Sequence, residues 1–369
     1  MSKIINIIGN PKIFNFTIVW MIVLVFFGTI AQKDIGLYNS QQKYFSNWIT
    51  WFWLLPTPGG RLTMLIMLIN ILGSFCSPSL WRVKKTGIII VHIGVLLLLL
   101  GGGLTAYFSF EGNMVIDEGQ TTDYIQSYHD SELTFINTDS SDFDEIVAFS
   151  NILLKKNNQL FHNTLPFEIE VIQFYENAEP IRRSEPKKDF FHGMAKNFMI
   201  IEKKPEKEAE YNRSGITFKI KNSNSQADGI YSLMLGQSIP QNFQVGTSNY
   251  TVKLRRERIY LPFKIELIDF VRVIHPGTSI PKSFSSEINL IEDNTSRRVL
   301  IEMNEPLRHE GYTFFQASFS QTAQGETSVL AVVQNYGRLF PYISSIIMSL
   351  GLLIHLLMQL PKLIKRKAT

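Results

Sequence analysis

Long apolar runs interrupt an otherwise ordinary polar sequence, and their lengths predict where the chain crosses a membrane. A helix needs about 20 apolar residues to span the hydrocarbon core of a bilayer. Four windows approach that length, at about residues 13–31, 60–76, 87–108 and 339–360. The second window is the weakest, because it is short and begins at Arg61. The pattern therefore predicts four transmembrane helices.

The segment 109–338, between the third and fourth windows, has a different pattern. Apolar and polar residues alternate there at period two, as in β-strands, at 132–136, 167–172, 216–220, 250–254, 263–268 and 298–302. About 230 residues are enough for a core of their own. We expect a membrane protein with helices in regions 1–108 and 339–369, and an antiparallel all-β, sandwich-like domain at 109–338 inserted between helices three and four. Residues 178–208, rich in Lys, Glu and Pro, predict a long loop.

Basic residues near the window ends predict the orientation in the membrane. They form three clusters: Lys3 and Lys12; Arg82, Lys84 and Lys85; and Lys362, Lys365, Arg366 and Lys367. Such clusters stay on the cytoplasmic side, and four crossings bring all three to one side. We expect cytoplasmic termini, with 32–59 and 109–338 outside, and the basic tail to be the true end of the chain. The first window is too long, and lacks the small-residue cleavage site, for a removed signal peptide.

The amino-acid composition and the absence of known motifs argue against several kinds of chemistry. Cys76 is the one cysteine, so no intrachain disulfide, Cys-x-x-Cys-His attachment site or thiol redox role is expected. No Ser/His/Asp pattern, phosphate-binding glycine loop or nucleotide fingerprint occurs, and we predict no catalytic residue. The glycines at 101–103 lie inside a membrane window and predict helix packing. The net charge of +4 follows from topology and does not indicate nucleic-acid binding.

His92 lies inside the third apolar window and is the strongest candidate for function. A charged group at such a place costs roughly 2.5–3.5 kcal/mol on insertion scales, and a neutral imidazole less. A neutral imidazole in an apolar setting is also a good ligand for haem iron. The structural alternative is a histidine that only hydrogen-bonds another helix.

His355, in the fourth window, is the second candidate haem-binding residue. His92 and His355 each lie about six residues, or roughly 9 Å, from the cytoplasmic end of their windows, so we expect them at one depth. Helical spacing puts small residues on both faces, among them Gly103 beside His92, and Gly351 and Ser344 beside His355. Small residues let helices or a flat ligand approach closely.

Other aromatic and histidine residues are open to plainer interpretations. Trp48, Trp51 and Trp53 in the 32–59 segment could form a platform for a flat ligand such as a porphyrin, or an aromatic belt at the membrane interface. Five histidines fall in the β region, and none has metal-ligand spacing with another: His129, His162, His192, His275 and His309. We expect these five to be surface or hydrogen-bonded residues.

The chain resembles the ResB/CcsB membrane proteins of the System II pathway of cytochrome c maturation. The resemblance covers about residues 13–120 and 262–360 and rests on motifs in order, namely Gly28-Thr-Ile-Ala-Gln32, Pro58-Gly-Gly60, His92-Ile-Gly-Val95, Glu118-Gly119, His275-Pro-Gly-Thr-Ser-Ile-Pro281, Asn304-Glu-Pro-Leu307 and Gly311-Tyr-Thr-Phe-Phe-Gln-Ala-Ser318. Each motif is weak alone, but their order and the topology are specific together.

The resemblance implies a haem-handling role in the bacterial cytoplasmic membrane. Such proteins work with a ResC/CcsA-type partner to carry haem b outward, where its vinyl groups are joined to the two thiols of a Cys-x-x-Cys-His motif in apocytochrome c. His92 then corresponds to an axial ligand of the haem iron, whereas His355 has no firm counterpart. The family's Trp-Trp-Asp motif belongs to the partner and is absent here, so this chain is expected to be a non-autonomous subunit of the synthase.

Two alternatives stay open. One is a membrane-anchored scaffold that stabilises the ResC/CcsA-type partner without binding haem, in which case His92→Ala should leave the yield of cytochrome c intact. The other is a sensor or transporter of another ligand, which is disfavoured because two intramembrane histidines offer no evident solute pathway.

Overall fold

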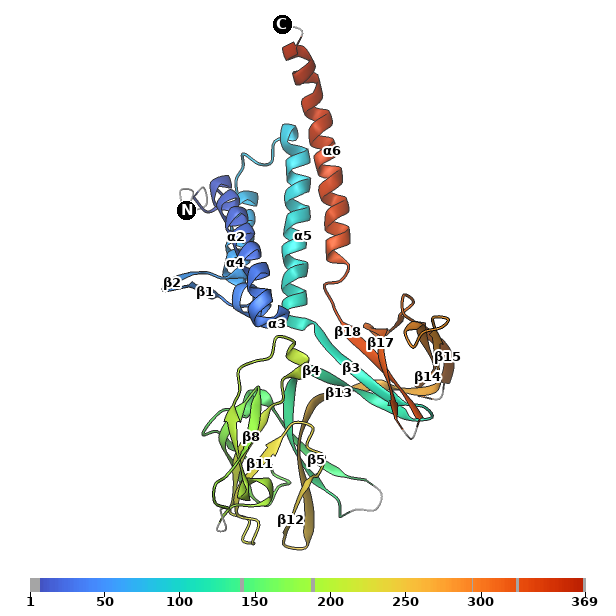
Figure 1. The fold of residues 1–369 in the computed structure, drawn as a ribbon. Coiled ribbons are helices and arrows are strands. Elements are labelled where there is room, and N and C mark those ends of the chain that lie inside the picture. Colours follow the sequence, from blue (N-terminus) through green and yellow to red (C-terminus); the bar gives the residue numbers. More distant parts are fainter. Residues whose placement is uncertain (1–6, 140–142, 187–189, 294, 323–324, 368–369) are drawn as a thin grey trace. The chain divides into compact units, whose positions relative to one another are not determined.

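The computed structural model describes residues 7–139, 143–186, 190–293, 295–322 and 325–367 (Figure 1). The chain forms two compact units. The helical unit comprises Met1–Phe110, His309–Tyr312 and Val333–Thr369, and the β unit comprises Glu111–Arg308 and Thr313–Val332.

Four helices dominate the helical unit: α2 (Pro11–Ile35), α4 (Gly60–Phe75), α5 (Thr86–Phe108) and α6 (Phe340–Lys367). Short turns accompany them: α3 (Leu37–Gln41), the π-helical turn η1 (Gln42–Ser46) and the 3₁₀ turn η2 (Val83–Lys85). Among the described residues, three helical stretches are long and apolar enough to cross a membrane: Pro11–Ile35, Val83–Phe108 and Phe340–Pro361. The predicted second helix forms as α4, but its 16 residues measure only about 24 Å. Its length alone does not establish a fourth crossing.

Small residues hold α5 and α6 together. Gly87, Gly94 and Gly101, seven residues apart, are all buried on α5. A Cβ added at Gly87 would lie 2.7 Å from the carbonyl oxygen of Gly351, and one added at Gly94 would lie 3.1 Å from that of Ser344. The backbones therefore pack almost directly on each other, as small residues permit. This confirms that Gly101 serves helix packing, and that Gly351 and Ser344 lie on the packed face of α6.

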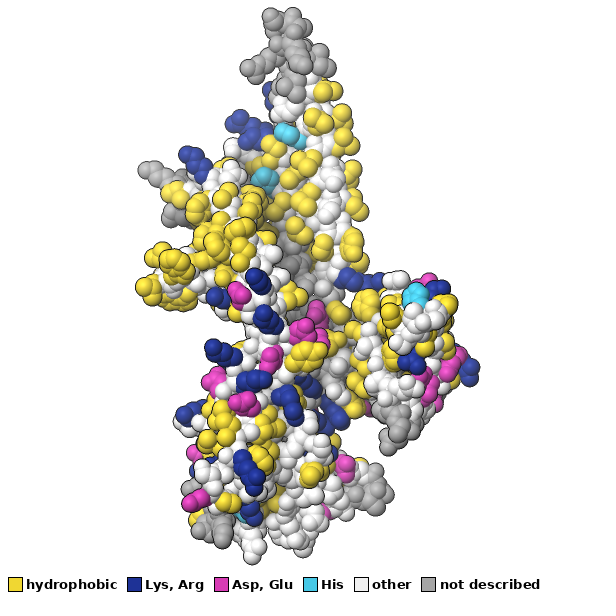
Figure 2. Space-filling view, in the orientation of Figure 1, with side chains coloured by type: hydrophobic (Ala, Val, Ile, Leu, Met, Phe, Trp, Pro, Cys, Tyr) yellow, Lys and Arg dark blue, Asp and Glu magenta, His cyan; other side chains and the backbone are white. Residues whose placement is uncertain are grey.

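Polar contacts join α4 to the beginning of α2. The Asn70 side chain donates to the carbonyl oxygens of Ile8 and Asn10, and the Ser74 hydroxyl donates to that of Gly9. Elsewhere the helices present apolar side chains outward, which cover much of their surface in Figure 2. Exposed examples are Phe16, Ile22 and Phe26 on α2, and Leu353 and Leu357 on α6. Such a surface suits a lipid environment.

The Trp-rich segment forms a β-hairpin of β1 (Ile49–Phe52) and β2 (Leu55–Pro58). Phe52 packs against Trp20 and Phe27 of α2, with ring centroids 5.9 and 5.0 Å apart. At the tip, Trp53 is 99% exposed and adopts a left-handed φ of 55°. The hairpin is therefore held by one aromatic face and presents its tip outward.

The β unit is built from antiparallel sheets. Its strands are β3 (Phe110–Asp117), β4 (Thr121–Asn137), β5 (Glu145–Ser150), β6 (Gln159–Leu160), β7 (Glu168–Tyr175), β8 (Ala178–Arg182), β9 (Phe198–Glu202), β10 (Gly215–Lys221), β11 (Gly229–Met234), β12 (Gln241–Val245), β13 (Ser248–Ile274), β14 (Pro281–Glu292), β15 (Thr295–Glu302), β16 (Leu307–His309), β17 (Tyr312–Thr322) and β18 (Gly325–Gln334). A large sheet runs in the order β15-β14-β13-β4-β3-β18-β17-β16, with β12 on β13 and β5 on β4. Smaller sheets run β11-β10-β7-β6 and β8-β9.

Five of the six segments predicted from alternation lie wholly within strands, and the sixth, 167–172, lies within β7 from Glu168 onward, which confirms the β-rich interpretation. Two of them, 250–254 and 263–268, belong to one 27-residue strand, β13. Its register with β4 shifts between Arg256 and Arg258 and between Tyr260 and Ile265. The main core lies between β4, β7, β10 and β13 and is rich in aromatic side chains such as Phe135, Phe167 and Phe218.

The prediction of a long loop at 178–208 is wrong in part, because β8 and β9 pair there from Ala178↔Glu202 to Arg182↔Phe198. Ala178 and Ile200 pack with Met234 of β11 in a small cluster of their own. Ala178 and Ile200 are the buried residues of β8 and β9, and the other residues of these two strands are exposed or partly exposed. The charged residues of this β8–β9 ribbon face solvent, so the apolar alternation that predicts strands is missing.

Candidate functional site

The His92 imidazole is oriented by its own helix. Its Nδ1 lies 2.9 Å from the carbonyl oxygen of Ile88, one turn earlier in α5. A carbonyl can only accept, so Nδ1 donates and the neutral ring keeps the lone pair on Nε2. The Phe75 ring packs edge-on against the imidazole with centroids 6.2 Å apart, and Trp81 lies 6.1 Å beyond Phe75. His92 is therefore a half-buried imidazole with one defined coordinating nitrogen.

The face of α5 that carries His92 is not the face that packs on α6. His92 follows Gly87 by five residues, which turns it about 140° away from the glycine row. It points toward α4, whose Phe75 it contacts. Farther along this face, a Cβ added at Gly103 would meet no atom of the described chain within 4 Å. The open position at Gly103 lies about 16.5 Å along the helix from His92.

His355 belongs to α6, and its backbone packs against a different part of α5. A Cβ added at Gly87 would lie 2.5 Å from the backbone nitrogen of His355. His355 is therefore level with Gly87, about 7.5 Å along α5 from His92. Its Nδ1 is buried and has no hydrogen-bond partner in the described part of the chain.

The predicted equality of depth for the two histidines is therefore wrong by about 7.5 Å. Distances from the ends of apolar windows do not fix a register, because α6 continues to Lys367 and the glycine row sets how the helices meet. The structure does not bring His92 and His355 onto one face of α5. Their roles as haem ligands stay predictions.

Sequence reasoning missed the neighbours of His92. Ile88 stands four residues earlier, the spacing at which a helical side chain reaches a backbone carbonyl. Phe75 and Trp81 flank the turn after α4, and no pattern in the sequence links them to His92. The seven-residue repeat Gly87, Gly94, Gly101 was visible in the sequence and marks the α6 face.

A polar cluster lies where β4 and β13 change register in the β unit. Arg255 and Glu132 form an ion pair at 2.7 Å, with side chains 16% and 7% exposed. The Arg256 guanidinium donates to the carbonyl oxygen of His129 at 3.2 Å. Burial lowers the pKa of His129 and raises the pKa of Glu257, to which Asp130 and Glu132 add a smaller upward effect. These contacts satisfy polar groups where the register of the two long strands shifts. We assign no metal-binding role to them.

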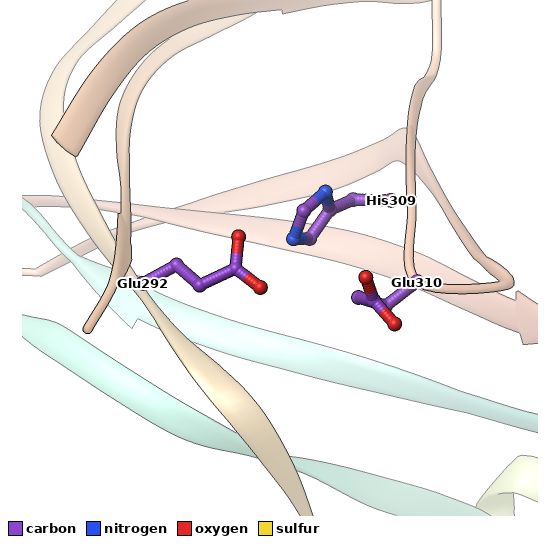
Figure 3. A group of neighbouring side chains, drawn as sticks. All are labelled: Glu292, His309 and Glu310. Carbon is purple, nitrogen blue, oxygen red and sulfur yellow. The ribbon is translucent and has the colours of Figure 1, made fainter. Parts of the chain in front are cut away.

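Figure 3 draws Glu292, His309 and Glu310, a group of histidine and carboxylate side chains. Glu310 and Gly311 form a turn with left-handed φ values of 48° and 80°. We assign no metal site to the group, because Glu292 belongs to the β unit and the other two residues belong to the helical unit. Exposed acidic groups also gather commonly without an ion.

Comparison with known proteins agrees with the pattern of motifs. The model of the ResB-like family matches residues 82–199 and 226–333, more than half of the chain. The chain is also 26% identical over 316 residues to Protein NrfI of Wolinella succinogenes. That match covers 79% of this chain and 29% of the relative. The chain thus spans less than a third of the length of that relative.

Proposed function

Since the chain belongs to the ResB-like family and is a multi-pass membrane protein, we propose that it is a haem-handling subunit of a cytochrome c maturation complex. Haem b is its substrate rather than a resident cofactor. A ResC/CcsA-type membrane protein is its partner, and apocytochrome c receives the haem. Both termini lie in the cytoplasm, and the β unit lies outside the bacterial cytoplasmic membrane.

The geometry of His92 carries this proposal. The backbone carbonyl of Ile88 holds the proton on Nδ1, which leaves Nε2 as the ligand atom. A hydrogen bond of this kind fixes the orientation of a ligating imidazole and raises its basicity. The Phe75 ring holds the imidazole from the side, and no described atom lies within 4 Å of a Cβ at Gly103, farther along the same face. His92 would bind the haem iron axially through Nε2.

The second axial ligand would come from the partner. His92 points about 140° away from the α6 face of α5, so His355 is poorly placed for the same iron. We retain His355 as a separate haem contact, because its buried Nδ1 has no hydrogen-bond partner among the described residues. It would act nearer the cytoplasmic side, before the haem reaches His92.

Covalent attachment needs little chemistry from this chain. Bringing the haem vinyl groups and the two cysteine thiols together is catalysis by orientation. This chain would supply the axial imidazole, the packed α5–α6 pair behind it, and a β unit that receives apocytochrome c. No acid–base pair of this chain is required.

An absorption spectrum of the full chain purified with its partner tests the proposal. In His92→Gly we expect the haem band to fall at least fivefold and to return when imidazole is added, since free imidazole can occupy the vacated position. Ile93→Gly, at the next residue and turned about 100° away from His92, is the matched control and should keep the band, since Ile93 is exposed. A spectrum of His92→Gly that equals wild type would refute axial ligation by His92.

A scaffold role is the second candidate, because a hydrogen bond from an imidazole to its own helix also occurs in purely structural histidines. In that case His92→Ala would leave both the partner's abundance and the cytochrome c yield intact. Under the haem-handling proposal, the same variant keeps the partner's abundance and loses the cytochrome. Measuring both quantities in one strain separates the two functions.

A further inference from the structure

A cleft of about 800 Å³ opens in the β unit, far in sequence from His92. It lies between the edge of β11 in the four-stranded sheet and the edge of β12 in the large sheet. The segment around Gly193 borders it. Nothing in the proposed path of haem accounts for it.

The wall of the cleft is polar but uncharged. None of the described residues that line it is Lys, Arg, Asp or Glu, and six of the lining residues carry carboxamide side chains: Asn197, Gln226, Gln237, Gln241, Asn242 and Gln244. Carboxamides both donate and accept hydrogen bonds without carrying charge. The cleft therefore suits a neutral ligand with hydrogen-bonding groups, and does not suit a phosphate or a metal ion.

Aromatic rings form the apolar part of the wall. The His192 imidazole stacks on Tyr231 with centroids 4.8 Å apart and planes 16° apart, and Phe243 lies 5.5 Å from Tyr231. The Tyr231 hydroxyl donates to the carbonyl oxygen of Ala227 at 2.8 Å, which fixes the ring. Tyr231 itself is buried, because Phe218 stacks on its other face, but His192 and Phe243 are partly exposed and can pack against a flat or apolar side chain.

The Gln241 side chain joins the two sheet edges through its Nε2, and its Oε1 has no donor in the described part of the chain. Its Nε2 donates to the carbonyl oxygen of Ser232 on β11 at 2.7 Å. Its Oε1 is buried. This oxygen lies against Gly193, so the Gln241 side chain forms an inner wall between the two sheet edges.

The edge of β12 offers backbone groups to the cleft. β12 pairs with β13 through a two-residue turn, with Val245 opposite Ser248. Residues that flank such a turn bond across the hairpin, so Gln241, Phe243 and Val245 bond to β13, and Asn242 and Gln244 direct their backbone groups away. The Ser225 hydroxyl, on the cleft side, accordingly donates to the Gln244 carbonyl at 3.3 Å.

We propose that this cleft binds an extended, uncharged polypeptide segment, which adds as a strand to β12 at Asn242 and places an apolar side chain against the partly exposed rings of His192 and Phe243. Strand addition gives affinity through backbone hydrogen bonds, and a neighbouring pocket gives selectivity. The inference rests on the proposed function, in which the polypeptide is the unfolded apocytochrome c near its haem-attachment motif. An oligosaccharide also suits carboxamides and aromatic rings, but it gains nothing from an open strand edge.

Disulfide trapping in the full-length protein with its partner tests this inference. Cys76 is the one natural cysteine, so Gln244→Cys in a Cys76→Ser background gives a unique thiol at the cleft. The probe is a synthetic Cys-x-x-Cys-His peptide with its first cysteine changed to serine and the second carried as a 2-thiopyridyl disulfide. Attack by the protein thiolate forms the protein–peptide disulfide and releases pyridine-2-thione, whose absorbance gives the rate.

Glu168→Cys, exposed on β7, is the matched control, and each rate is divided by the rate with dithiodipyridine alone. We expect Gln244→Cys to react at least tenfold faster than the control, and an all-serine peptide to compete. Adding Asn242→Pro, which removes the edge N–H, should abolish the advantage, whereas Asn242→Ala should keep most of it. Equal reaction rates at the two cysteines would overturn the inference. So would equal effects of Asn242→Pro and Asn242→Ala on the rate, or competition by maltodextrin and not by the all-serine peptide.

The outcome is separable from that for haem handling. Gln244→Cys should keep the haem band that His92→Gly loses. If wild type shows no haem band and the cleft still captures the peptide, the haem proposal fails and the peptide site stands. If the haem band depends on His92 and the cleft captures no peptide, the haem proposal stands and the peptide site fails.

Discussion

Gly101 and Gly103 of α5 stand two residues apart in one glycine run and have opposite surroundings. A Cβ at Gly101 would collide with the Phe340 side chain, whereas one at Gly103 would meet no described atom within 4 Å. The sequence does not distinguish them, because both lie in the same apolar window. Only the register of α6 against α5 gives one a packing role and leaves the other open.

Alanine substitution should separate the two glycines. Gly101→Ala forces Phe340 aside and should lower stability by about 1–3 kcal/mol, the usual cost of overpacking. Gly103→Ala should be neutral or stabilising by up to about 1 kcal/mol, because alanine favours helix. Thermal unfolding of the two variants in the same detergent checks this, and an equal loss at both positions would contradict the packing described for α5 and α6.

At the scale of elements, the bend in β4 and β13 depends on a buried ion pair. Removing one partner of such a pair leaves a buried charge, which costs about 3–5 kcal/mol. Arg255→Ala should therefore destabilise the protein by about 3 kcal/mol. Arg298→Ala, which breaks an exposed pair with Glu287, should cost less than about 1 kcal/mol. Chemical denaturation of both variants, followed by tryptophan fluorescence, gives the comparison.

The same bend should make stability depend on pH. Burial lowers the pKa of His129 in the folded protein. The unfolded chain then binds a proton more readily, so stability falls as the pH drops below about 6.5, the ordinary value for histidine. Glu257 acts in the opposite direction, because its raised pKa makes the folded state bind a proton more readily than the unfolded chain as the pH falls toward 4.5.

His129→Asn should therefore flatten the stability profile between roughly pH 6.5 and 5.5. The measurement is the unfolding midpoint of wild type and variant at several pH values across that range. His162→Asn, at an exposed histidine, is the control and should follow wild type. If the stability profile of the variant runs parallel to that of wild type, His129 does not cause the pH dependence.

At the scale of the whole molecule, orientation in the membrane can be tested with the single natural thiol. The predicted topology puts Cys76, which is exposed, on the cytoplasmic side. A membrane-impermeant maleimide should label it only in permeabilised cells, whereas Gln244→Cys in the Cys76→Ser background should react in intact spheroplasts. Labelling of both thiols in intact spheroplasts would contradict cytoplasmic termini.

Elements that depend on a short-range sequence pattern could be predicted from the sequence. Contacts between residues far apart in the chain could not. Period-two alternation located the six strand segments, and hydropathy located α2, α5 and α6, because burial on one or all faces leaves a local mark. The β8–β9 ribbon escaped, since its core is a single residue on each side. His92 was identified from its apolar setting, but Phe75 and the β11–β12 cleft depend on tertiary contacts that no local pattern records.

The small residues of the long helices also limit how the helical unit can move. Gly87 and Gly94 meet Gly351 and Ser344, and Gly101 meets Gly337 just before α6, so the facing positions repeat every seven residues on both sides. A slide by three or four residues would press a full side chain against a bare backbone. The next permitted alignment lies a whole repeat away, about 10.5 Å along the axis. Helix α6 is therefore held in one alignment beside α5. Under the proposed function, we expect any rearrangement that admits haem to involve α4, whose Phe75 contacts the His92 imidazole.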